Sequence, residues 1–145
     1  MDEQILRLTE EYGEILQTWN RTYEDYAKSV GLSYTSLSVL SMIYATENCT
    51  QKMICETRFL PKQTVNSIVT SFYKKGWLKL KEMPDDRRNK IIVFTPEGRK
   101  EAERLVLPLR NAEKNAMKAL SQEQREALTH VTRLYAELCA KEMQR

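Results

Sequence analysis

Polar side chains without charge cover one face of a predicted helix near the middle of the chain. No residue from Gln63 to Tyr73 is charged, whereas an ordinary solvent-facing helix usually carries Glu and Lys. Amides and hydroxyls can hydrogen-bond the edges of DNA bases without the desolvation cost of a charge. We therefore predict that this face contacts DNA rather than only water. The predicted contact residues are Lys62, Gln63, Thr64, Asn66, Ser67 and Thr70.

A charged segment follows this helix and suggests a second contact. It reads Pro84-Asp85-Asp86-Arg87-Arg88-Asn89-Lys90. Most charge runs are solvated turns, but one placed directly after a DNA-reading helix is typical of a contact with the neighbouring backbone or minor groove. We predict that Asp86 orients the arginines by charge-assisted hydrogen bonds, so that one of them reaches a narrow groove. The predicted contacts of this segment are Asp86, Arg87, Arg88 and Lys90.

The elements that position these residues can be predicted from spacing. Four apolar residues of the DNA-reading helix recur at steps of three and four and should form one buried stripe: Val65, Ile68, Val69 and Phe72. Pro61 suits the first helical turn, and Gly76 suits a left-handed helix end with Trp77 as its apolar partner.

A short helix is predicted immediately before the turn. Thr50 should cap it, Met53 and Ile54 should face inward, and Phe59-Leu60 should lead into the turn. After the DNA-reading helix, Leu78 and Leu80 alternate with lysines, as in a strand with one basic face. The return strand is predicted at residues 90–94, with residues 82–89 as the loop between the strands.

Long amphipathic helices flank this central region. The first is predicted from the N-terminus to near Gly31, and a second, apolar on most sides, should be central. Thr95-Pro96-Glu97-Gly98 resembles a helix start, and Ser121–Gln124 has the form of a capping box that begins a last helix. The predicted fold is mainly α with a small β-hairpin: a winged helix-turn-helix. Residues 1–145 are predicted as a single domain, with a head at 32–95 and dimerisation helices at 1–31 and 96–145.

Charge and composition agree with nucleic-acid binding. The chain has 145 residues and a net charge of +3. Between Thr50 and Lys90 there are ten basic and four acidic residues, whereas the rest of the chain has thirteen basic and sixteen acidic ones. Positive charge is therefore concentrated on the region predicted to meet phosphate.

The three cysteines, Cys49, Cys55 and Cys139, lack CxxC spacing and are odd in number. This argues against a disulfide framework and a zinc site, and it favours a reduced, cytoplasmic protein. The N-terminus does not resemble a signal peptide, and no apolar run approaches the ~20 residues of a membrane span.

Enzymatic function is not expected. The one histidine, His130, has no partner constellation nearby in sequence, and there is no GxGxxG motif, P-loop, metal-ligand cluster or evident cofactor site. The main alternative to a DNA-binding regulator is a winged-helix adaptor that binds an acidic protein partner without specific DNA binding. Titration with duplex DNA would distinguish the two functions.

Three segments give the chain a family resemblance over nearly its whole length. They are Gly76-Trp77-Leu78, Asp86-Arg87-Arg88 and Phe94-Thr95-Pro96-Glu97-Gly98. The chain resembles the MarR family of bacterial transcriptional regulators. The resemblance implies a homodimer made by the first and last helices, a pseudo-palindromic DNA operator, usually repression, and an effector pocket between dimerisation helices and heads. Phe94 stands where leucine is usual, and the amides of the DNA-reading helix imply that a different DNA sequence is read.

Cysteines and aromatic residues are the candidate features for sensing an effector. Thiol-based peroxide sensors of this family carry a reactive cysteine in the first helix, which here has none. Trp19, Tyr23 and Tyr34 could line an aromatic pocket for a phenolic or other lipophilic ligand. Aromatic residues at helical spacing belong more often to a core, and both interpretations stay open.

Overall fold

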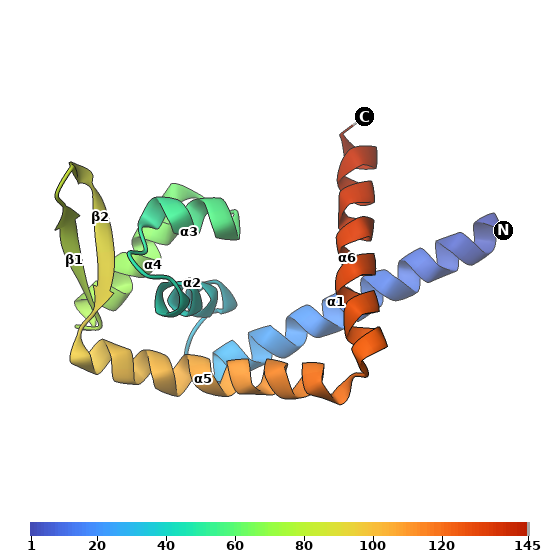
Figure 1. Ribbon diagram of the computed structural model, residues 1–145, viewed down its shortest axis with the longest axis horizontal. Coiled ribbons are helices and arrows are strands. Elements are labelled where there is room, and N and C mark those ends of the chain that lie inside the picture. The colour runs from blue at the N-terminus through green and yellow to red at the C-terminus, as the bar shows by residue number, and fades with distance from the viewer. Residues whose placement is uncertain (145) are drawn as a thin grey trace. The chain divides into compact units, whose positions relative to one another are not determined.

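The computed structural model describes residues 1–144, with the exception of the side chain of Arg87. The chain divides into two compact units, residues 1–107 and 108–145. The mainly α fold with one hairpin confirms the predicted fold class (Figure 1). The elements are α1 (Asp2–Ser29), α2 (Tyr34–Ala45), α3 (Gln51–Arg58), α4 (Lys62–Lys74), β1 (Leu78–Met83), β2 (Asp86–Phe94), α5 (Pro96–Ala119) and α6 (Gln122–Met143).

The core of the first unit forms around α2. This helix buries residues on most of its circumference, as its apolar sequence predicts: Leu37, Val39, Leu40, Met42 and Ile43. The predicted stripe of α4 packs into the same core through Val65, Val69 and Phe72, with Ile68 half-buried. α3 contributes Ile54, which is fully buried. The predicted burial of Met53 is wrong: it is 37% exposed, because the short α3 presents only one narrow face to the core.

The end of α4 is closed by a glycine cap, as predicted from the sequence. Gly76 takes a left-handed backbone with φ of 79°. Its N–H donates to the Tyr73 carbonyl at 3.0 Å, and the N–H of Trp77 donates to the Phe72 carbonyl at 3.1 Å. This pair of bonds is a Schellman motif, and its usual apolar contact is present because the Phe72 and Trp77 rings stack with centroids 5.4 Å apart.

The hairpin differs from its predicted form. The return strand β2 begins at Asp86, not Lys90, so only Pro84 and Asp85 form the turn. Residues 86–89 are charged and polar, which is typical of a loop, but the strand begins at Asp86 because this residue pairs with Met83 of β1, irrespective of side-chain polarity. Pairing is interrupted near the tip, because Met83 is opposite Asp86 but Glu82 is already opposite Lys90. Residues 87–89 therefore form a bulge.

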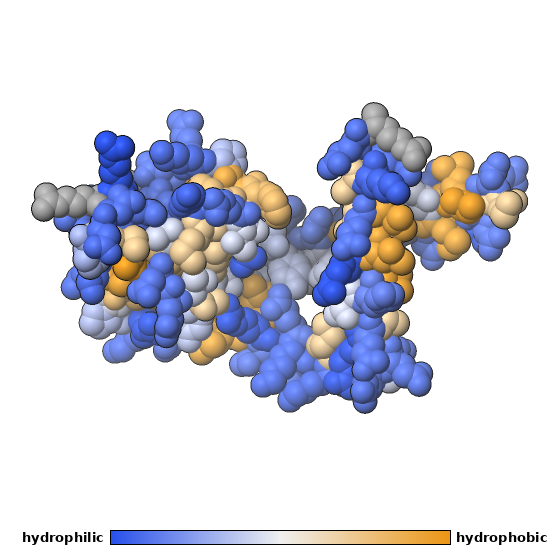
Figure 2. Space-filling view, turned by 45° about the horizontal axis from the view of Figure 1, so that its top comes forward, coloured by the Kyte–Doolittle hydropathy of each residue, from blue (hydrophilic) through white to orange (hydrophobic). Residues whose placement is uncertain are grey.

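The second unit contains the end of α5 and all of α6. The predicted capping box is present: the Ser121 hydroxyl accepts the N–H of Gln124, and the Gln124 side chain accepts the N–H of Ser121. α6 has no buried residue within the described chain. Its exposed apolar side chains are visible along the helix in Figure 2. They are Leu128, Val131, Leu134, Tyr135 and Leu138.

α1 also exposes apolar side chains, most of them in its first half and at Trp19. No helix in residues 1–144 has the length and apolar character needed to cross a membrane.

Candidate nucleic-acid interface

The outer face of α4 is accessible along its whole length. The buried stripe on the opposite side fixes the rotation of the helix about its axis. As a result the predicted contact residues point away from the core. Thr64 is half-buried, and the other predicted residues are exposed: Lys62, Gln63, Asn66, Ser67 and Thr70.

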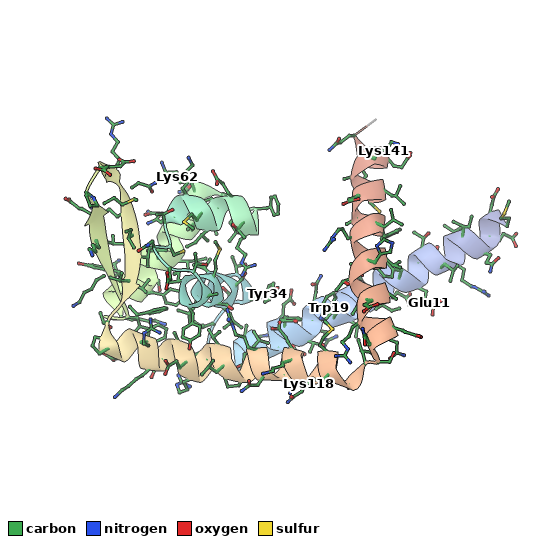
Figure 3. The ribbon with its side chains drawn as sticks, viewed as in Figure 1. Glu11, Trp19, Tyr34, Lys62, Lys118 and Lys141 are labelled. Atoms are coloured by element: carbon green, nitrogen blue, oxygen red, sulfur yellow. The ribbon has the colours of Figure 1, made fainter. Side chains whose placement is uncertain are left out.

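A groove joins this helix to the hairpin. It has a volume of about 660 Å³ and lies between α3, the start of α4 and the hairpin. Lys62 and Asn66 line it from α4, and Arg88 and Lys90 line it from β2. Lys62 is labelled in Figure 3, in the region between the helices and the hairpin. The fold therefore brings the two predicted contact segments, which are separated in sequence by the rest of α4 and by β1, to one groove.

The rest of the groove includes residues of α3 that were not predicted from the sequence as DNA contacts. The first turns of this helix supply Gln51, Lys52, Cys55 and Glu56. Lys52 lies 4.0 Å from Glu56, one turn further along the helix. Both side chains of this pair are mostly exposed, so the pair adds little stability. In the sequence, the indication that α3 begins at this place was its N-cap residue Thr50, whose hydroxyl accepts the N–H of Met53.

The bulge at the hairpin tip is held by Asp86. Its Oδ1 accepts a hydrogen bond from the backbone N–H of Arg88 at 3.0 Å. The sequence predicted a bond from Asp86 to an arginine side chain, whereas the bond observed at Arg88 is to its backbone. Asp86 thus sets the direction of the chain at Arg88, and the Arg88 side chain is exposed. The predicted contact by the side chain of Arg87 falls outside the described part of the chain.

The hairpin is anchored to the connection between α2 and α3. The Ile92 N–H donates to the carbonyl of Cys49 at 2.8 Å, and Thr50 forms a β-bridge with Ile91. Cys49 is fully buried, and this burial raises the pKa of its thiol to about 11. The thiol is therefore protonated at neutral pH and is a poor nucleophile. Its role is to fill space beneath β2.

Two further grooves run beside α4. One, of about 650 Å³, is lined by Gln63, Asn66, Ser67, Thr70, Ser71, Lys74 and Lys75. The other, of about 630 Å³, places α4 beside the start of α2 and adds Ser33, Thr35 and Ser36. The sequence did not single out these hydroxyls. Ser33 caps α2 by accepting the N–H of Ser36 at 3.1 Å, and a capping serine was the only local signal for them.

The three aromatic residues predicted for an effector site form a chain of edge-to-face contacts. The ring centroids of Trp19 and Tyr23 are 6.1 Å apart, and those of Tyr23 and Tyr34 are 5.7 Å apart. Trp19 is 57% exposed and Tyr34 is 41% exposed. Figure 3 shows Trp19 on α1 and Tyr34 at the start of α2. The cluster therefore presents an open aromatic surface within the first unit.

Two helices joined by a tight turn, the second with a polar outer face beside a basic hairpin, define a winged helix-turn-helix of the DNA-binding class. Residues 30–89 match the sequence model of the MarR family. The regulator SarZ of Staphylococcus saprophyticus is 30% identical over 108 residues, which cover 74% of this chain and 71% of SarZ. The chain belongs to the MarR family of transcriptional regulators.

Solved structures support the same fold. A MarR family regulator from Neisseria meningitidis superposes with a TM-score of 0.79 at 21% identity, covering 93% of this chain and 95% of that one. MepR of S. aureus, solved in complex with DNA, superposes with a TM-score of 0.71 at 19% identity, covering 87% and 97%. Both chains align over most of their length, so the likeness includes the long flanking helices.

Proposed function

We propose that this protein is a ligand-responsive repressor that binds a pseudo-palindromic operator as a homodimer. The observation that carries this proposal is the shared groove of α4 and the hairpin. Asn66 offers an amide for base edges, and Lys62, Arg88 and Lys90 bring positive charge for phosphate to the same groove. α4 would enter the major groove, and the hairpin tip would reach the adjacent minor groove or backbone.

The proposed contact residues on α4 are Lys62, Gln63, Thr64, Asn66, Ser67 and Thr70. On the wing, which is the hairpin of β1 and β2, the proposed contact residues are Arg87, Arg88 and Lys90, and Asp86 is proposed as a positioning residue. Asp86 serves by positioning rather than by touching DNA, because its carboxylate is engaged by the backbone of Arg88. MepR was solved with DNA bound, which supports this use of the fold.

The proposed division of the chain assigns the head to residues 32–95 and the dimer contacts to residues 1–31 and 96–145. Support comes from the exposed apolar side chains of α6, of which Val131 is 58% exposed and Leu138 is 49% exposed. A row of such residues on one helix is normally buried against another protein surface. A second copy would provide that surface and would place two heads on the two halves of a palindromic site.

The proposed effector is a small phenolic or lipophilic molecule that contacts Trp19, Tyr23 and Tyr34. The edge-to-face chain of rings offers apolar ring faces to such a molecule. An effector bound there would alter DNA affinity only to the extent that it binds the two states of the protein differently.

Footprinting on the promoter adjacent to the gene, followed by titration of that duplex and a scrambled duplex, tests the proposal. We expect a protected site with two related half-sites and a preference of at least about a thousandfold over scrambled DNA. Equal, weak binding to both duplexes would instead indicate a winged-helix adaptor for a protein partner.

A further inference from the structure

Thr95 forms more hydrogen bonds than a helix-capping residue needs. Its hydroxyl oxygen accepts the N–H of Gly98 at 3.0 Å, which caps α5. The same hydroxyl donates to the carbonyl of Gly76 at 2.6 Å. Its backbone N–H donates to the carbonyl of Trp77 at 3.0 Å. One residue therefore joins the cap of α4, the start of β1, the end of β2 and the first turn of α5.

Gly98 makes this junction sterically possible. A Cβ built at Gly98 would overlap the carbonyl of Trp77 and would lie 2.6 Å from the Trp77 Cα. The obstacle is backbone and not a flexible side-chain end, so it cannot rotate away. Any larger residue at position 98 would push the first turn of α5 off the base of the hairpin.

The junction is also supported from the side of Trp77. The Trp77 ring stacks on Phe72, which is 1% exposed and belongs to the core. The Lys75 ammonium lies 4.8 Å from the centroid of the Trp77 ring, in cation–π geometry. The carbonyl of Trp77, which accepts the backbone N–H of Thr95, is thus part of a well-packed segment.

We propose that Thr95 and Gly98 are positioning residues for DNA binding. They fasten the start of β1 and the end of β2 to α4 and α5, an arrangement called the clamp below, and thereby set where Arg88 meets DNA. The inference rests on the proposed function. Its physical basis is leverage. The bulge shortens the reach of β2, so the length of the hairpin is that of β1. The six residues from Leu78, beside the clamp, to Met83 at the tip span roughly 17 Å at about 3.3 Å per residue. A rotation of about 5° at the base would move the tip by about 1.5 Å, enough to break a hydrogen bond to DNA.

The primary test compares Thr95→Val with Thr95→Ser in the full-length protein. Valine has the same shape as threonine but lacks the hydroxyl, whereas serine keeps it. We expect Thr95→Val to weaken operator binding about tenfold, because the clamp loses two hydrogen bonds of ordinary strength. We expect Thr95→Ser to bind within about twofold of wild type, since both hydroxyl bonds are kept. For Thr95→Val, the slope of log K against log salt should become shallower by about 0.9 for each phosphate that the displaced wing no longer reaches.

A double-mutant cycle separates positioning from simple stability. Thr95 and Arg88 lie toward opposite ends of the hairpin, so independent effects would add. If Thr95 acts through the wing tip, the weakening caused by Thr95→Val should fall below about threefold when Arg88 is already alanine. Thr95→Asn provides a second variant, because asparagine still caps α5 while the hydroxyl bond to Gly76 is removed. It should weaken operator binding less than Thr95→Val, by about threefold, since one bond of the two is lost.

Three results would overturn the inference. One is Thr95→Val with a lowered melting temperature but wild-type affinity at a temperature where it is folded. Another is an undiminished effect of Thr95→Val in the Arg88→Ala background. The third applies if Thr95→Val does not fold: folded Thr95→Asn would then bind the operator with wild-type affinity. Absence of operator binding by the wild-type protein is distinguishable from all of these, because it would overturn the proposed function itself.

Discussion

Replacing Asp86 by alanine is expected to weaken operator binding, although the change removes a negative charge next to DNA. In the structure the Asp86 carboxylate accepts the Arg88 N–H at 3.0 Å and holds the bulge at the wing tip. Alanine cannot accept this bond. The tip would then sample several conformations, and Arg88 would have to be ordered again each time DNA binds.

Two opposing effects decide the size of the change. An exposed hydrogen bond of this kind contributes about 1 kcal/mol, which is about fivefold in affinity for each wing and about twenty-five-fold for a dimer. The repulsion relieved by removing the charge is smaller. At about 10 Å from a phosphate in water it amounts to about 0.4 kcal/mol, and physiological salt reduces it further. The positioning effect should therefore prevail.

Asp86→Asn is the matched control, because it keeps an acceptor oxygen and removes only the charge. We expect it to bind the operator at least as tightly as the wild type. The assay is fluorescence anisotropy with labelled operator and scrambled duplexes at one fixed salt concentration, with all three proteins. If Asp86→Ala binds more tightly than wild type and equals Asp86→Asn, bulk charge controls the wing and Asp86 positions nothing.

Four further outcomes are expected. Arg88→Ala should weaken operator binding more than Lys79→Ala in the same titration, because Arg88 lines the groove while Lys79 lies on a strand outside it; equal effects would refute this. Gln63→Ala or Asn66→Ala should reduce the preference for operator over scrambled duplex by about 1–3 kcal/mol if either makes a good base-edge pair, and uniform weakening on both duplexes would indicate phosphate contact instead. Deletion of residues 121–145 should abolish dimerisation in analytical ultracentrifugation, and a folded dimeric truncation would place the interface elsewhere. Wild-type binding should fall by about 10³–10⁵ between roughly 50 and 200 mM salt if the dimer makes roughly six to ten phosphate contacts, and a flat response would exclude DNA as the partner.

The accurate predictions from sequence concern features set by neighbours along the chain. The buried stripe of α4, the glycine cap at Gly76 and the helix N-caps at Thr95 and Ser121 depend on residues within one or two helical turns. Helix periodicity and cap geometry are local, so residue type and spacing are enough to specify them. The polar face of α4 follows from the same periodicity, because the stripe fixes which side is outside.

Features that depend on distant partners were decided only by the tertiary structure. The strand beginning at Asp86 exists because β1 lies opposite it, and its bulge follows from the register at Glu82 and Met83. Local polarity could not reveal either. Met53 has the residue type of a core position, but the core meets α3 at Ile54.

The groove and the clamp show the same distinction at the level of function. The sequence by itself determined a polar helix face, a basic segment after it and the family to which the chain belongs. It could not bring Lys52 to the same groove as Arg88, nor Thr95 to the carbonyl of Gly76, 19 residues earlier in the chain. Both of these contacts depend on how α3, the hairpin and the start of α5 pack around α2. A contact between distant segments is selected by the packing of the whole core and not by the two residues that meet.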